Sequence, residues 1–225
     1  MSKGGYINLL LANQKKKSDP GDNKFMMSAR QVFLTEGHYD FLIECVNETL
    51  VSQDAFNAFK MESCYLLDLG CGTGYYTNEI LKTLPINKVG LDISKSGITI
   101  AAKHNQDISY IVGSVFDLPI SDNKVEVLLN IFSPFSMAEL KRVLATGGYF
   151  VKVIPAETHM KEIAELVYDE FRPHESEVEK SFMEDDDFDM IDLYINGEIM
   201  ESFQTDYFDR ETIKRRITPH DNDDW

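Results

Sequence analysis

Short, continuous apolar runs recur through the middle of the chain and predict buried strands. Runs of about four to eight apolar residues bounded by turn residues are typical of strands covered on both faces of a sheet. The five runs lie at residues 64–70 (CYLLDLG), 88–93 (KVGLDI), 109–114 (SYIVGS), 125–132 (VEVLLNIF) and 147–154 (GGYFVKVI). We therefore expect five strands in this part of the chain.

Between most of these runs the apolar positions recur at helical spacing instead. This spacing predicts helices around residues 76–84, 98–102, 137–144 and 157–168. The third of them is expected to stop at Gly147 and Gly148, because glycine commonly ends a helix. Alternation of strands and helices favours a parallel sheet with helices on both faces and ligands at the carboxyl ends of the strands. We therefore predict an α/β, Rossmann-like fold.

The first part of the chain has a different pattern. Residues 1–21 mix a short apolar run with lysines and a Ser-Asp-Pro-Gly-Asp turn, which indicates an irregular arm. Two helices are expected between Phe25 and Val51, with a break at residues 36–38. We therefore divide the chain into an arm with helices over residues 1–60 and a core over residues 61–225, together forming one compact unit.

Charge and composition restrict the classes of partner. The chain has 225 residues, is 43% hydrophobic and carries a net charge of −16, which opposes long-range attraction to nucleic acid or to an anionic membrane. The lysines at positions 15–17 could still form a local basic patch, or simply a solvated segment. No apolar stretch reaches the length of a membrane span, so we expect a cytoplasmic protein without membrane contact.

Residues that commonly bind metals do not form a regular pattern. Cys45, Cys64 and Cys71 have no CxxC spacing, which argues against a disulfide framework and a zinc ribbon. The acidic run at residues 185–187 has no accompanying ligand spacing, so a solvated loop is the preferred interpretation. We predict no metal site.

A glycine-rich loop joins the first predicted strand to a helix. Glycines here let backbone N–H groups approach a ligand where side chains would collide. NAD sites and P-loops also use glycine, but the P-loop signature GK[ST] is absent. Asp68 lies two residues before the loop, and Asp92 ends the second strand, where a carboxylate can accept both hydroxyls of a ribose. The alternatives are a loop-capping role for Asp68 and a tight turn without ligand.

The spelling D-x-G-C-G-T-G resembles motif I of the class I methyltransferases that use S-adenosylmethionine (SAM), whereas the dinucleotide fingerprint is G-x-G-x-x-G. This resemblance implies that SAM is the cofactor. It also implies roles for residues at the ends of the third and fourth strands, which are Ser114 and Asn130. The cofactor-binding candidates are therefore Asp68, Gly70, Cys71, Gly72, Gly74, Asp92, Ser114 and Asn130.

Longer segments are similar to the bacterial 23S ribosomal RNA guanine-N1 methyltransferases, which include the tylosin-resistance enzymes. These segments are GYINLL, KSDPGD, MMSARQVFLTEGHYDFL, LDLGCGTGYYT, GLDISKSGI, AELKRVLATGGYF and RRITPH, which together extend over most of residues 5–220. The resemblance implies SAM contacts at Tyr39, Tyr75, Tyr76, Asp92 and His159. Tyr39 could instead pack a helix face, and His159 could lie at a helix start without a role.

The resemblance implies methyl transfer to N1 of a guanine, which also requires loss of the N1 proton. His159 and Asp19 are the candidate catalytic bases. The family carries an N-terminal zinc ribbon that grips RNA and a final strand beyond the TPH-like segment. We expect both to be missing from this chain, so SAM binding is expected more firmly than turnover.

Two other functions remain open on the sequence. A small-molecule methyltransferase fits the acidic charge, and a SAM-binding module without catalysis fits the expected missing segments. The sequence leaves open which guanine is methylated and the oligomeric state.

Overall fold

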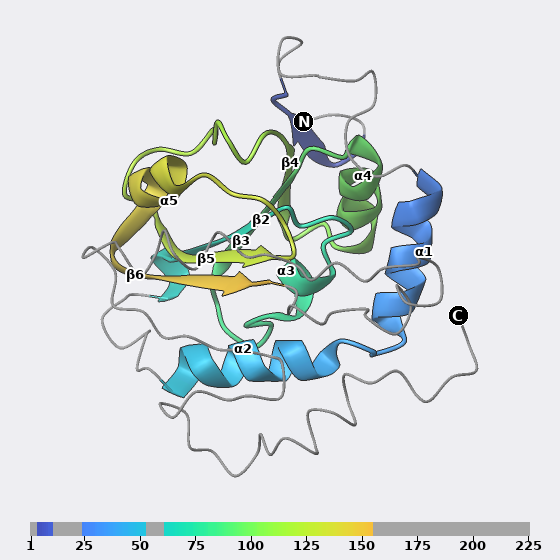
Figure 1. Ribbon diagram of the computed structural model, residues 1–225, viewed down its shortest axis with the longest axis horizontal. Helices are drawn as coiled ribbons and strands as arrows, with labels where there is room; N and C mark the ends of the chain where they lie inside the picture. Colours follow the sequence, from blue (N-terminus) through green and yellow to red (C-terminus); the bar gives the residue numbers. More distant parts are fainter. Residues whose placement is uncertain (1–3, 11–23, 53–60, 155–225) are drawn as a thin grey trace, which may run out of the picture. The chain divides into compact units, whose positions relative to one another are not determined.

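The computed structural model describes residues 4–10, 24–52 and 61–154. Within these residues a six-stranded sheet has the order β1-β4-β3-β2-β5-β6, and every neighbouring pair is parallel (Figure 1). The strands are β1 (Tyr6–Asn8), β2 (Tyr65–Leu69), β3 (Asn87–Asp92), β4 (Ser109–Val112), β5 (Val125–Ile131) and β6 (Leu144–Val153). The strand order changes direction between β2 and β5, which is the point where open α/β sheets bind ligands.

Five α-helices accompany the sheet in the described part of the chain. They are α1 (Lys24–Thr35), α2 (Asp40–Ser52), α3 (Tyr75–Glu79), α4 (Lys95–His104) and α5 (Met137–Val143). The predicted break between the first two helices is confirmed, and Gly37 has a φ of 86° there. Ser94 caps α4 and Ser136 caps α5, because each hydroxyl accepts a hydrogen bond from a backbone N–H of the first turn.

Helices cover both faces of the sheet, as the alternation predicts. On one face, Leu67, Leu91 and Ile111 pack in a buried cluster with Val143 of α5. On the other face, Tyr110 and Val112 of β4 belong to a buried cluster with residues of α4, which are Ile98, Ala101 and Ala102. Neighbouring residues of β4 belong to different clusters because successive side chains of a strand point to opposite faces. The Rossmann-like prediction is confirmed.

Two local predictions were wrong. The N-terminal arm contains a strand, since Tyr6 is buried and pairs with Tyr110 in the parallel register of β1 with β4. The helix predicted to stop at the glycine pair ends earlier, and β6 begins at Leu144 and runs through Gly147 and Gly148. Gly147 has a φ of 76°, so these glycines permit an irregular strand entry rather than a helix stop.

Several predictions lie outside the described residues. They concern the helix at 157–168, the lysines at 15–17, the acidic run at 185–187 and the expected missing strand. The chain divides into the units Met1–Val153 and Ile154–Trp225, and the division at residue 60 stays a prediction. Among the described helices, none is long and apolar enough to cross a membrane.

Candidate functional site

The glycine loop is fixed on the neighbouring strand at the carboxyl edge of the sheet. The N–H groups of Gly70 and Cys71 both donate to the carbonyl oxygen of Leu91 in β3, at 2.8 and 3.1 Å. Gly70, Gly72 and Gly74 have φ values of 76°, 55° and 77°, a region that side-chain-bearing residues rarely adopt. The loop conformation therefore depends on glycine at all three positions.

The three glycines differ in what surrounds them. A Cβ on Gly70 would lie 2.5 Å from Oγ of Ser133, and one on Gly74 would lie 2.5 Å from the hydroxyl oxygen of Tyr110. A Cβ on Gly72 would meet no atom within 4 Å. Gly70 and Gly74 thus permit close packing inside the protein, whereas Gly72 adjoins open space.

Asp92 is held in one orientation at the end of β3. Its Oδ2 accepts from the N–H of Gly72 at 2.8 Å, and its Oδ1 accepts from the N–H of Ser94 at 2.7 Å. The side chain therefore links the glycine loop to the start of α4, and its carboxylate is fixed at the carboxyl edge of the sheet.

Asp68 lies beneath the loop and is only 2% exposed. Its Oδ2 accepts from the hydroxyl of Thr77 at 2.5 Å. Burial raises the pKa of Asp68 to about 7, against the lowering effect of the Thr77 hydrogen bond. Burial also raises the pKa of the neighbouring Cys71 thiol well above its usual value, so that thiol stays protonated. These two side chains brace the loop from inside the protein.

Asn130 is completely buried near the end of β5, and its amide is fully engaged. Its Nδ2 donates to the carbonyl oxygens of Leu69 at 3.2 Å and Pro134 at 3.1 Å, and its Oδ1 accepts from Lys152. Burial lowers the pKa of Lys152 to about 8. This network fixes the turn after β5 against the end of β2, at the change of strand direction.

Ser114 lies in the turn that follows β4. Its hydroxyl accepts from the N–H of Phe116 at 3.2 Å, which stabilises a turn that leaves Phe116 62% exposed. The N–H of Gly113 donates to the carbonyl oxygen of Asp92 at 3.0 Å, so this turn begins directly beside the end of β3.

Aromatic side chains from separate elements meet at this edge. Tyr39, between α1 and α2, makes an edge contact with Phe132 at the end of β5, with 5.9 Å between ring centroids. Burial raises the pKa of Tyr39 and, together with Tyr39 itself, that of Tyr76. Tyr75 stacks edge-on against Tyr76 and donates its hydroxyl hydrogen to Asp40. The structure thus brings together the three tyrosines that the sequence analysis predicts as cofactor contacts.

A pocket of about 530 Å³ lies on the helical side of the loop. It is bounded by residues of α1, α2, α3 and α4 and by Thr73 and Gly74 of the loop, and it extends to His104. His104 ends α4, whereas Asp92 lies near its start, and ten helical residues span about 15 Å. This pocket therefore extends away from Asp92.

The predicted catalytic residues His159 and Asp19 lie outside the described residues. Among the residues that are described, no group of three or more side chains could hold a metal ion. Sequence reasoning missed Ser133 and Lys152, which buttress the loop through Leu69 and Asn130. No local motif marks either residue, because their roles arise only from packing between strands that are distant in sequence.

Comparison with known proteins gives three results. Residues 67–152 match the family model described as a methyltransferase domain. The 23S rRNA (guanine(748)-N(1))-methyltransferase of Streptomyces fradiae is 31% identical over 169 residues, which is 74% of this chain and 58% of that protein. YxjB of Bacillus subtilis, a candidate 23S rRNA (guanine-N1)-methyltransferase, is 31% identical over 173 residues, or 75% of this chain and 58% of its own length.

Among solved structures, the complex of the Haloferax volcanii Trm112 methyltransferase activator with a methyltransferase is similar in fold. Its TM-score is 0.51 at 23% identity, with 88% of this chain and 94% of that chain covered. The chain spans just under three-fifths of the length of the curated relatives, 58% in both cases.

Proposed function

This chain belongs to the class I SAM-dependent methyltransferases, and on that premise we propose that it methylates N1 of a guanine in 23S ribosomal RNA. The observation that carries the proposal is the similarity to proteins named for this reaction over about three-quarters of the chain, 74% and 75%. The family model matches residues 67–152, which include the loop, Asp92 and the turn after β5.

We further propose that the cofactor binds along the carboxyl edge of the sheet. Asp92 would accept the ribose hydroxyls, because its carboxylate is fixed at the end of β3 beside the glycine loop. The open space beside Gly72 would admit the part of SAM that approaches the backbone, and Ser114 would lie on the nucleoside side. Tyr39 and Tyr76 would close the site near Phe132.

Asp68, Cys71 and Asn130 would support this binding site without contacting the cofactor. They are 2%, 6% and 0% exposed, and the polar atoms of Asp68 and Asn130 are bound to Thr77, Leu69 and other protein groups. Their proposed role is to hold the loop and the turn after β5 in place.

Bound SAM supplies an electrophilic methyl group. The protein must align the acceptor nitrogen with that methyl group and exclude water, which converts an encounter of two molecules into a step within one complex. Neutral guanine carries hydrogen at N1, so a base must take that proton as the N1–C bond forms and the C–S bond breaks. His159 and Asp19 remain the proposed candidates for that base.

The test is transfer of tritiated methyl groups from SAM to unmodified 23S rRNA fragments, together with calorimetric titration of S-adenosylhomocysteine. Asp92→Asn is the matched control, since it retains the side-chain shape and removes the charge that fixes the loop. Incorporation at guanine N1, mapped as a block to reverse transcription, would support the proposal. Binding of S-adenosylhomocysteine without methyl incorporation into any 23S fragment would contradict it.

A second candidate is a small-molecule methyltransferase, which the net charge of −16 favours. RNA binding through phosphate contacts weakens steeply with salt, because counterions are released. Measuring 23S fragment binding at rising salt would distinguish the two functions: a small-molecule enzyme shows no specific RNA affinity at any salt concentration.

A further inference from the structure

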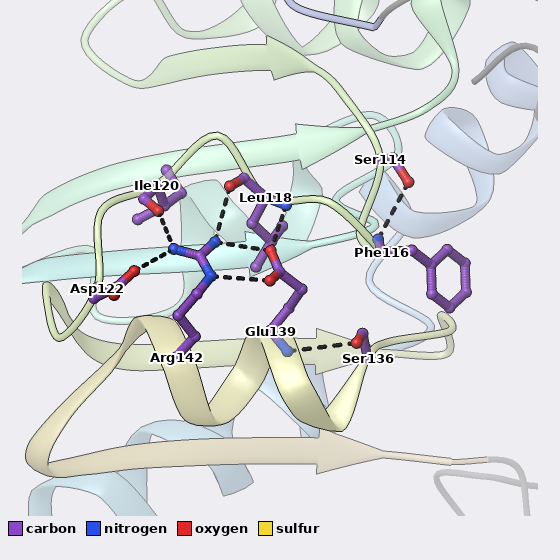
Figure 2. A network of polar contacts seen from close by, with 8 residues as sticks. All are labelled: Ser114, Phe116, Leu118, Ile120, Asp122, Ser136, Glu139 and Arg142. Carbon is purple, nitrogen blue, oxygen red and sulfur yellow. Dashed lines mark hydrogen bonds and ion pairs between the residues drawn. The ribbon is translucent and has the colours of Figure 1, made fainter. Parts of the chain in front are cut away.

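The segment after β4 runs from the candidate site to the face of the sheet that α5 covers. We name residues 113–122 the strap. It begins at Gly113, which is hydrogen-bonded to Asp92, and it places Val115 and Leu118 in the buried cluster on the α5 face. Phe116 between them points outward and is 62% exposed (Figure 2). The strap therefore begins beside Asp92 and is anchored on the face of the sheet that α5 covers.

Arg142 of α5 binds the strap through its whole guanidinium group. Its NH1 donates to the carbonyl oxygen of Ile120 at 2.7 Å, and its NH2 donates to that of Leu118 at 3.0 Å. The remaining donors bind Asp122 at 2.7 Å and both carboxylate oxygens of Glu139 at 2.9 and 2.8 Å (Figure 2). An arginine has five N–H donors, and all five are used here.

Glu139 completes the attachment from the same helix. Its Oε2 accepts from the N–H of Leu118 at 2.6 Å as well as from Arg142. Hydrogen bonding to Arg142 lowers the pKa of Glu139, so the carboxylate remains charged. Asp122 is 75% exposed and adds little, whereas Arg142 and Glu139 are 30% and 17% exposed. Two side chains thus hold both backbone groups of Leu118 and the carbonyl of Ile120.

The attachment links the two sides of the candidate site. α5 follows the turn that Asn130 fixes after β5, while the strap leaves the sheet beside Asp92 on β3. The side chains of Arg142 and Glu139 bind the strap and each other, so their effect on a ligand beside Asp92 would pass through the strap backbone. We infer that Arg142, together with Glu139, is a positioning residue that holds the strap, and with it Ser114, in place for the nucleoside part of SAM.

This inference rests on the SAM-binding site in the proposed function and not on the RNA substrate. Binding of S-adenosylhomocysteine to the full chain is measured by calorimetry for the wild type, Arg142→Met and Lys103→Met. Both variants remove one positive charge, but Lys103 is an exposed residue in the last turn of α4, whereas Arg142 binds the strap. We expect about tenfold weaker binding for Arg142→Met and less than about twofold for Lys103→Met.

Backbone hydrogen exchange in residues 113–122 separates positioning from general loosening. Arg142→Met should accelerate exchange in the strap and leave β2 and β3 protected. Arg142→Lys should restore only part of the affinity, because an ammonium cannot reproduce the planar fork that spans two carbonyls and a carboxylate. Should Arg142→Met fail to fold, Glu139→Gln and Arg142→Lys provide the same comparison.

Unchanged affinity in a folded variant whose strap exchanges faster would overturn the inference, as would an equal loss in Lys103→Met. Either result leaves the proposed function intact, because wild-type binding and methyl transfer are measured separately. Wild-type binding of S-adenosylhomocysteine without methylation of RNA would instead contradict the proposed function and leave the role of Arg142 standing.

Discussion

The buried carboxyl group of Asp68 gives a quantitative prediction about pH. Its pKa is raised from 3.8 to about 7 by burial, so the folded state holds the proton more tightly than the unfolded chain does. A raised carboxyl pKa contributes stability that is complete below the unfolded value and is lost as pH rises through the folded value. The contribution of Asp68 to stability therefore falls as the pH rises from about 4 to about 7, and it levels off above the folded pKa.

The size of the effect follows from the two pKa values, 3.8 and about 7. Between pH 5.5 and 8.5 the unfolded chain is ionised at Asp68 throughout, whereas the folded protein loses its proton near pH 7, so the two states differ over about 1.5 pH units. At about 1.36 kcal/mol per unit, the contribution of Asp68 to the free energy of unfolding should fall by about 2 kcal/mol. Asp68→Asn preserves an oxygen that can accept from Thr77 but does not titrate. The difference in free energy of unfolding between wild type and Asp68→Asn should therefore change by about 2 kcal/mol across this range.

The assay is urea unfolding of both proteins at several pH values, with carbon NMR of the Asp68 carboxyl as a direct measurement. Thr77→Val is a second variant, and it should raise the Asp68 pKa further because the Thr77 hydroxyl favours the charged form. A carboxyl resonance that titrates below pH 5, or a wild-type to Asp68→Asn difference that is flat between pH 5.5 and 8.5, would refute the reasoning.

Three further substitutions test the site. Gly72→Ala should lower the unfolding free energy by only about 1 kcal/mol, since only its backbone conformation is unfavourable, while calorimetry shows about tenfold weaker binding of S-adenosylhomocysteine. Gly74→Ala should cost about 2–4 kcal/mol in urea unfolding, because its Cβ would also collide with Tyr110. Asn130→Leu should lower the unfolding free energy by about 2–3 kcal/mol in the same assay, since buried carbonyls and Lys152 lose their hydrogen-bond partner. Near-wild-type stability of Gly74→Ala or Asn130→Leu would contradict these contacts.

Much of the fold was predictable from local pattern. Continuous apolar runs identified β2 to β6, and helical spacing identified the helices between them, because burial on both faces and an amphipathic helix each leave a clear periodicity. The three-residue strand β1 has no such signature. It exists because Tyr6 reaches a buried place beside Tyr110, a pairing across about one hundred residues of sequence.

The site divides in the same way between sequence and structure. The glycine spelling and Asp92 are local features of the sequence. The resemblance of that spelling to motif I of the class I methyltransferases is what predicted SAM as the cofactor. The role of Asn130 required the tertiary structure: the residue stands at a strand end, like a ligand contact, but its amide is occupied by Leu69, Pro134 and Lys152. The attachment of the strap by Arg142 likewise depends on residues about twenty positions apart. Hydrogen bonds between distant segments leave no periodicity in the chain, so only packing reveals which polar residues face a ligand and which hold the protein together.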